Sequence, residues 1–257
     1  MNNFEKWVAF QTILIKEVRR YVRIWPQTLL PPAITMTLYF VIFGALIGSR
    51  IGEMGGFSYM QFVVPGLIMM SVVTNSYSNV VSSFFGAKFN HSVEELLVSP
   101  VPNWIILSGY ILGGVSRGLM VALIVTCLSL FFAELTVHNL PLTIAIVIAT
   151  SILFALFGFI NAVFANNFDD ISIIPTFVLT PLIYLGGVFY SMDLLPEFWR
   201  GVSQLNPLVY VVNGFRYGVL GVSDVDVRFA FAMILLFTVT AFAFCMHLLN
   251  TGKRLRE

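Results

Sequence analysis

Long apolar runs separated by short polar segments dominate the hydrophobic pattern of this chain. A helix crosses a bilayer with about 20 apolar residues, and only helices or closed barrels satisfy their backbone groups in lipid. The runs lack the alternation typical of strands, so the pattern predicts an all-α protein with six membrane-spanning helices. We expect these spans at about residues 27–48, 59–82, 107–132, 140–164, 171–190 and 227–249.

The first 25 residues show a different pattern, in which large apolar side chains recur at helical spacing. The repeat predicts an amphipathic helix over residues 4–25. Its apolar stripe comprises Trp7, Phe10, Leu14, Val18, Tyr21 and Trp25, and four basic residues cluster away from the stripe: Lys16, Arg19, Arg20 and Arg23. Such a helix lies along the membrane surface with its basic face toward lipid phosphates. The alternative is a peripheral helix packed on the core of the protein itself.

Composition agrees with a membrane protein. The 257 residues are 58% hydrophobic and only 11% charged, whereas soluble domains contain about 25% charged residues. The chain therefore has no room for a sizeable soluble domain, and we expect one domain over residues 1–257 with a six-span bundle at 27–249. A formal net charge of +1 gives no indication of nucleic-acid binding.

Basic residues predict the orientation, because short cytoplasmic loops are enriched in Lys and Arg. With the N-terminus inside, the cytoplasmic side holds Lys6, Lys16, Arg19, Arg20, Arg23, Lys88, Lys253, Arg254 and Arg256. The outer side then holds Arg50, Arg200, Arg216 and Arg228. This excess predicts that both termini lie in the cytoplasm.

Catalytic motifs are missing from the sequence. No G-x-x-x-x-G-K-[ST] phosphate loop occurs, so the chain does not cradle ATP in that way. The three histidines are scattered and do not pair with the two cysteines at ligand spacing, which argues against a metal site. We expect neither an enzyme nor a metalloprotein.

A few polar residues fall inside the expected spans. Arg117 lies well inside the third span, where it either extends along the helix to the headgroups or lines a pathway or subunit interface. Asn75 and Tyr77 in the second span either face a pathway or pack helix against helix.

The segment 184–221 interrupts the last two spans. Gly186, Gly187 and Pro196 break the helix, and the apolar stretch 208–221 is too short to cross the membrane. The pattern favours a re-entrant hairpin on the outer face, with a surface loop as the alternative. Within such a hairpin, Arg216 needs an anionic or carbonyl partner.

At this point the residues resemble a known family. The run 179–216 resembles the signature of ABC-2-type transporter permeases, the membrane subunits of a class of ATP-driven exporters. The resemblance rests on Leu182, Leu185, Gly186, Val188, Leu195, Pro196, Pro207, Leu208, Tyr210 and Arg216. The segment EELLVSPVP at 94–102 and the six-span topology extend it over nearly the whole chain. The chain is most similar to the bacterial group that includes nodulation-factor and polysaccharide exporters.

The resemblance implies a division of labour between subunits. The loop after the second span would be a coupling helix, seated in a separate ATPase subunit that binds ATP and Mg. Its candidate residues are Glu94, Glu95, Leu96, Leu97 and Pro100, and Asp169 and Asp170 either form a second contact or cap the fifth span. Two copies of the chain would join two ATPase chains in the cell inner membrane.

The main alternative is an ion-coupled secondary carrier or a channel that works without ATP. Such proteins bury titratable residues along the route and often show internal repeats, and the sequence shows neither. The abundance of aromatic and methionine residues suits an amphipathic cargo, such as a lipid-linked glycan or a drug-like molecule.

Overall fold

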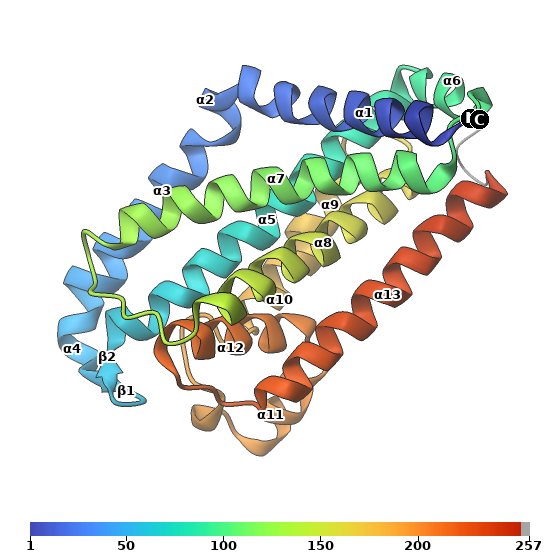
Figure 1. Ribbon diagram of the computed structural model, residues 1–257. Helices are drawn as coiled ribbons and strands as arrows, with labels where there is room; N and C mark the ends of the chain where they lie inside the picture. Colours follow the sequence, from blue (N-terminus) through green and yellow to red (C-terminus); the bar gives the residue numbers. More distant parts are fainter. Residues whose placement is uncertain (253–257) are drawn as a thin grey trace.

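The computed structural model describes residues 1–252, without the side chains of Ala45 and Ser49. Lys253, Arg254 and Arg256, which entered the charge count above, lie outside the described residues. Helices make up nearly all of the architecture, and the longest of them run side by side (Figure 1). The four longest helices of the bundle are α5 (Tyr59–Phe89), α7 (Asn103–Ser129), α8 (Leu140–Phe164) and α13 (Val227–Thr251).

Shorter helices complete the chain. The N-terminal part comprises α1 (Asn3–Arg23), α2 (Trp25–Thr28), α3 (Leu30–Phe40), the π-helical turn Val41–Gly48 and α4 (Ser49–Ile51). Between α5 and α7 lies α6 (Ser92–Val98). After α8 come α9 (Asp170–Ile174), the π-helical turn Pro175–Leu179, α10 (Thr180–Tyr184), the 3₁₀ turn Met192–Leu194, α11 (Glu197–Gln204) and α12 (Pro207–Leu220).

Four stretches of the described chain are long and apolar enough to cross a membrane: Trp25–Gly48, α7, α8 and α13. The second expected span coincides with α5, which is longer than needed but more polar. The fifth coincides with the shorter apolar stretch Asp170–Tyr184. By length and composition alone, four of the six expected spans therefore qualify.

Two local details differ from the sequence expectation. A two-stranded antiparallel hairpin interrupts the helical fold, with β1 (Glu53–Met54) paired to β2 (Phe57–Ser58). Its turn consists of Gly55 and Gly56, which adopt positive φ values of 61° and 81° that favour glycine. In addition, the fifth apolar helix ends at Tyr184 rather than at residue 190. The chain turns there because Gly187 adopts a φ of 72°.

Glycines allow α7 to pack closely on three neighbours. A Cβ atom at Gly113 would lie 2.5 Å from Cβ of Glu17 on α1. On the other side, a Cβ at Gly114 would lie 2.6 Å from Val80 on α5 and 3.1 Å from Ala155 on α8. Small residues spaced by four let membrane helices approach at backbone distance. The sequence GYILGGVSRG, residues 109–118, thus places α7 between α1, α5 and α8.

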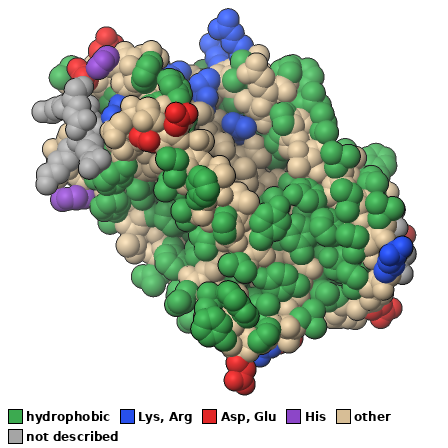
Figure 2. Space-filling model, turned by 180° about the vertical axis from the view of Figure 1, so that it is seen from behind, with side chains coloured by type: hydrophobic (Ala, Val, Ile, Leu, Met, Phe, Trp, Pro, Cys, Tyr) green, Lys and Arg blue, Asp and Glu red, His purple; other side chains and the backbone are tan. Residues whose placement is uncertain are grey.

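The two ends of the bundle differ in content. Both described ends of the chain lie toward the same end of the bundle as α6, whereas β1, β2, α11 and α12 lie toward the opposite end (Figure 1). In the space-filling view, charged side chains gather toward the ends and a broad hydrophobic band lies between them (Figure 2). A band of this kind matches the hydrocarbon layer of a bilayer.

Gly158 provides a test of the close helix packing. A Cβ at this position would lie 2.5 Å from the backbone oxygen of Tyr77, so Gly158→Ala forces α8 away from α5. We expect a loss of about 1–3 kcal/mol, measured by thermal unfolding of the purified protein in detergent. Gly86→Ala is the matched control, because nothing lies within 4 Å of a Cβ there. Equal melting temperatures for the two variants would contradict the packing described here.

Candidate functional site

The short helix α6 follows directly on the end of α5. His91 adopts a left-handed conformation with a φ of 57° and redirects the chain, and its Nδ1 lies 3.1 Å from Oε1 of Glu94. Glu94 and Glu95 occupy the first turn, where carboxylates complement the helix dipole. Both are exposed. The helix therefore presents two carboxylates on the surface at the end of the bundle where the chain termini lie.

Apolar residues anchor α6 to the body of the protein. Val93 is buried, and Leu96 and Leu97 are partly buried against the hydrophobic core. Val98, by contrast, is 82% exposed. The helix ends at this residue, two positions before the exposed Pro100. The exposed side chains of α6 are thus those of Ser92, Glu94, Glu95 and Val98, on an anchored support.

The loop between α8 and α9 lies next to this helix. The ring of Phe168 packs on Phe85 and Phe89 of α5, with centroid distances of 5.0 and 4.9 Å. A carboxylate oxygen of Asp170 accepts the backbone N–H of Asn166 at 2.8 Å and closes the loop, while Asp169 stays exposed. The two expected contact segments, at α6 and at residues 166–170, are therefore held against the same end of α5. We call them together the inner face.

A cavity of about 360 Å³ opens on the inner face. Its lining comprises Phe85, Lys88, Phe89, His91 and Asn166. The ammonium of Lys88 donates to the carbonyl oxygens of Val163 and Ala165 at 2.8 and 2.9 Å, at the end of α8. A lysine at that position satisfies carbonyl groups that the helix leaves free. Lys88 thus ties α5 to α8 beneath the inner face.

A buried carboxylate attaches α1 to the bundle. Glu17 is completely buried, and its Oε1 accepts a hydrogen bond of 2.7 Å from the hydroxyl of Ser83 on α5. Lys16 and Arg20 flank the carboxylate at 3.3 and 3.6 Å. A buried charge is costly unless it is paired and hydrogen-bonded. The Glu17 cluster, comprising Lys16, Glu17, Arg20 and Ser83, supplies two nearby cations and a hydrogen bond to Oε1, whereas Oε2 has only the charge of Arg20 at 3.6 Å.

The basic members of the Glu17 cluster reach further into the bundle. The guanidinium of Arg20 donates to the backbone and side-chain oxygens of Asn79 at 2.8 and 2.9 Å. The ammonium of Lys16 donates to the hydroxyl of Tyr110 on α7 at 3.2 Å. Desolvation alone lowers the pKa of Lys16, but Tyr110 and Glu17 together raise it above its ordinary value. Two of the five basic residues of α1, Lys16 and Arg20, therefore bond to α7 and α5, whereas Arg19 and Arg23 remain exposed.

Arg117 bonds inside the bundle. The residue is 9% exposed, and its guanidinium donates to the backbone oxygen of Thr28 at 3.2 Å and to the side-chain oxygen of Asn75 at 2.9 Å. These contacts join α7 to α5 and to the break between α2 and α3. Arg117 therefore links α7 to α5 and to the end of α2 through hydrogen bonds.

Arg216 holds the outer turn in place. Its side chain is completely buried, and Nη2 donates to the carbonyl oxygen of Gly187 at 2.7 Å. Its Nε donates to the carbonyl oxygen of Phe62 at 3.4 Å, and the guanidinium carbon lies 3.8 Å above the ring of Phe62. The carbonyl partners that Arg216 was expected to need are therefore present. They join α12 to α5 and to the turn after α10.

The rest of the segment 184–221 folds around this contact. Most of α12 is buried, and the helix packs on α5, α8 and α13, with Pro207 in its first turn. Gly186 lies against Leu208, and the hydroxyl of Tyr210 donates to the carbonyl oxygen of Gln204 at the end of α11. Pro196 directly precedes α11. Arg200 on α11 forms an ion pair of 2.9 Å with Asp193 in the preceding 3₁₀ turn.

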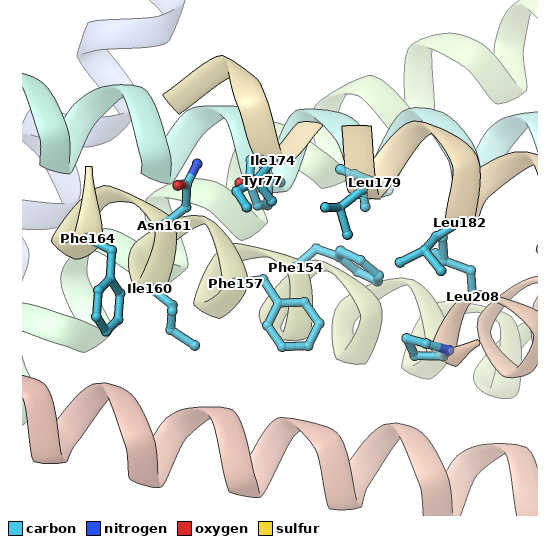
Figure 3. A pocket seen from close by; sticks show the side chains of 12 residues that line it. Tyr77, Phe154, Phe157, Ile160, Asn161, Phe164, Ile174, Leu179, Leu182 and Leu208 are labelled. Atoms are coloured by element: carbon cyan, nitrogen blue, oxygen red, sulfur yellow. The ribbon is translucent and has the colours of Figure 1, made fainter. Parts of the chain in front are cut away.

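An apolar cavity of about 460 Å³ lies deeper in the bundle. Figure 3 shows Tyr77 and Asn161 among apolar side chains from α8, from the stretch Asp170–Tyr184 and from the start of α12. Tyr77 therefore faces a cavity, whereas Asn75, two residues earlier on α5, contacts Arg117. The cavity suits an apolar chain or ring system rather than an ion.

Comparison with known proteins decides the family. The family model described as ABC-2 type transporter matches residues 8–220. The chain belongs to the ABC-2 type transporter family. It is 59% identical over 251 residues to the inner membrane transport permease YadH of Escherichia coli strain K12, covering 98% of both chains. It is 20% identical to nodulation protein J of Neorhizobium galegae, over 95% of this chain and 92% of that one.

These relatives establish the class of this ABC-2 permease. The chain is a multi-pass protein of the inner membrane, and the apolar helices of its bundle fit that location. The relative from Escherichia coli is a transport permease by name. Within the described residues, no group of three His, Cys, Asp or Glu side chains is placed to hold a metal ion.

Sequence reasoning missed the Glu17 cluster. In the sequence, Glu17 stands between Lys16 and the pair Arg19 and Arg20, which suggests a solvated charged face. The available signal was the polar series at Asn75, Asn79 and Ser83, which recurs every four residues on one face of α5. A polar stripe along a helix expected to be buried needs polar partners from another element.

Substituting Glu17 tests the attachment of α1. Glu17→Ala leaves the hydroxyl of Ser83 and the charge of Arg20 without their carboxylate, which we expect to cost about 1–3 kcal/mol. Hydrogen exchange at residues 3–23 should rise, as measured by mass spectrometry. Glu94→Gln is the control, because that side chain is 49% exposed. Unchanged exchange in the Glu17 variant would show that the cluster does not hold α1.

Substituting Arg216 tests the outer turn. Arg216→Met keeps the bulk but leaves the carbonyl of Gly187 without its donor, at an expected cost of about 1–3 kcal/mol. Exchange at residues 184–195 should rise in this variant. The control is Arg200→Met, which removes an exposed ion pair with Asp193, worth at most about 1 kcal/mol, and a hydrogen bond of 3.3 Å to the carbonyl of Met192. If the two variants loosened this segment equally, Arg216 would not be its anchor.

Proposed function

We propose that the chain is the permease subunit of an ATP-binding cassette exporter and works with a separate ATPase subunit. The observation that carries the proposal is the inner face. There, the exposed carboxylates of Glu94 and Glu95 stand on an anchored helix beside the loop at residues 166–170. ABC-2 permeases work with ABC ATPases in general. In this proposal, ATP and Mg bind to the ATPase subunit and not to this chain.

The proposed topology has six spans with both termini in the cytoplasm. We take α5 as the second span, because a buried helix tolerates polar residues that a lipid-facing helix does not. The stretch Asp170–Tyr184 forms the fifth span, at about 22 Å, and the turn after it completes the crossing. This arrangement is supported by the position of both described chain ends at the same end of the bundle as α6 (Figure 1). The segment 184–221, with α12, then forms the outer re-entrant hairpin.

The helix α1 lies in the inner membrane interface in this proposal. Trp7 on α1 and Trp25, which begins α2, are 55% and 54% exposed, and Arg19 and Arg23 of α1 are exposed as well. Tryptophan and arginine are typical of the headgroup level. The opposite side of the helix, with Ile13, Glu17 and Tyr21, is buried against the bundle. The helix thus contacts lipid on one side and protein on the other.

The proposed mechanism transmits force through anchored contacts. Closure of two ATPase subunits on ATP displaces α6 in each of two permease copies. Because Val93 is buried against the core and the Glu17 cluster joins α1 to α5, the displacement moves α1, α5 and α7 together. Arg216 carries the movement of α5 to the outer turn. The pathway between the two copies opens outward, and hydrolysis resets it.

An amphipathic cargo fits the chemistry of the bundle. The cavity at Tyr77 and Asn161 is almost wholly apolar, and it lies between α5, α8 and the fifth span. A lipid-linked glycan or a drug-like molecule presents the apolar part that such a surface accepts.

Charge reversal on α6 tests the coupling. In the double variant Glu94→Lys and Glu95→Lys, the carboxylates that would pair with basic residues of the ATPase become repulsive. We expect the ATPase to be lost from the purified complex, or its ATP hydrolysis to be uncoupled from transport, with normal amounts of permease in the membrane. The measurement is co-purification together with ATP hydrolysis in proteoliposomes.

Glu197→Lys is the control, because it makes the same kind of charge reversal, at one position, on the outer helix α11. It should leave the complex and its hydrolysis unchanged. If the α6 double variant retained the ATPase and coupled ATP hydrolysis to transport as the wild type does, the inner face would not be the surface that contacts the ATPase.

A further inference from the structure

A second hollow lies between α1 and α7, at the end where both helices begin. It has a volume of about 490 Å³. Its lining includes Lys6, Trp7, Phe10, Trp104, Ser108 and Leu112. The α1 residues stand three or four positions apart, and so do those of α7, so each helix contributes one face. We call this hollow the α1–α7 groove.

The groove is chemically graded along its length. Ile13 lies against Gly109 and Glu17 against Gly113, so α1 and α7 run parallel in a constant register. In the same register, Lys6 stands level with the start of α7, and Phe10 lies about one turn further in. Leu112 is eight residues beyond Trp104, or about 12 Å deeper. One end is therefore polar and basic, and the other is apolar.

The apolar part is accessible and aromatic. Trp7 and Trp104 are 55% and 50% exposed, and the rings of Trp7 and Phe10 stack at 5.6 Å. Leu112 is 37% exposed. Half-exposed tryptophans are typical of the membrane interface, where one end of the ring is apolar and the other is wet. A lipid chain would cover this surface.

The polar end carries positive charge without a carboxylate partner. Among the described residues, the ion pairs involve Lys16, Arg20, His91 and Arg200, and none involves Lys6. The neighbouring Glu5 is occupied, because its carboxylate accepts the backbone N–H of Asn2 in a capping box. No side chain caps the start of α7 at Pro102. The uncapped positive end of the α7 dipole therefore lies near a half-buried ammonium, whereas the start of α1 is already capped by Asn2 and Glu5.

We propose that the α1–α7 groove binds an anionic phospholipid of the inner leaflet. The phosphate lies at Lys6 and the start of α7, and an acyl chain runs along Phe10 toward Leu112. The charge complementarity favours an anionic lipid over a zwitterionic one, because the groove lining contains no carboxylate for a headgroup ammonium. Basic pockets between membrane helices recognise such headgroups. The inference concerns membrane placement and does not depend on the ATPase partner.

Native mass spectrometry of the delipidated full chain in detergent tests this proposal. Dioleoyl phosphatidylglycerol and dioleoyl phosphatidylcholine are titrated separately, and the dissociation constant of the first bound lipid is measured. We expect phosphatidylglycerol to bind the wild-type chain at least five-fold more tightly. Lys6→Gln should weaken phosphatidylglycerol binding about five-fold, which corresponds to about 1 kcal/mol for one basic residue at an anionic lipid. Lys6→Arg should restore it.

Arg19→Gln is the matched control, because it removes a positive charge from the exposed side of the same helix. It should leave the first dissociation constant unchanged. Circular dichroism and size exclusion confirm that each variant is folded. Equal affinity for the two lipids, or an equal loss in the Arg19 and Lys6 variants, would overturn the proposal. Displacement of phosphatidylglycerol by an equal concentration of soluble glycerol phosphate would also overturn it, since the acyl chain would then contribute nothing.

Discussion

A charged side chain inside an apolar bundle must find its partners within the chain, and this constraint organises the whole structure. Glu17 is satisfied by Ser83, Lys16 and Arg20, which fastens α1 to α5. At the other end, Arg216 is satisfied by backbone carbonyls of Phe62 and Gly187, which fastens α12 and the outer turn to α5. Breaking such contacts leaves a buried charge without a partner, so they persist while the surrounding elements move. The helix α5 takes part in both.

Between these two attachments the helices are packed at backbone distance. Gly113 and Gly114 let α7 approach α1, α5 and α8, and Gly158 lets α8 approach α5. Packed elements of this kind shift as bodies rather than deform continuously. In the proposed mechanism, this close packing would transmit a displacement of α6 to the turn after α10. The charged residues lie in clusters that join helices, which suits a permease moved by a partner better than a carrier that passes ions along its own side chains.

Hydrophobic patterning predicted the long helices well, because membrane helices leave the clearest local signal. The expected span 140–164 coincides with α8, and the start of α13 at Val227 was also predicted. The predicted end of the fifth helix, at residue 190, lies beyond the observed end at Tyr184, because apolar residues continue past the helix into the turn at Gly187. The carbonyl partners of Arg216 were expected from the cost of burying its charge, whereas the position of Glu17 depends on Ser83, which is distant in sequence. The rotation of α1 on the bundle could therefore not be read from its own stripe of apolar residues.

We propose that this chain forms the transport pathway, hydrolyses no ATP itself and is driven at its inner face by a separate ATPase subunit. Transport into proteoliposomes that contain either the purified chain alone or the chain with its ATPase tests it most directly, with fluorescent lipid-linked glycans and amphipathic drugs as cargo. The account predicts accumulation only when the ATPase and Mg-ATP are both present, and no accumulation on a proton or sodium gradient. Uphill movement of cargo by the chain alone on such a gradient would contradict it.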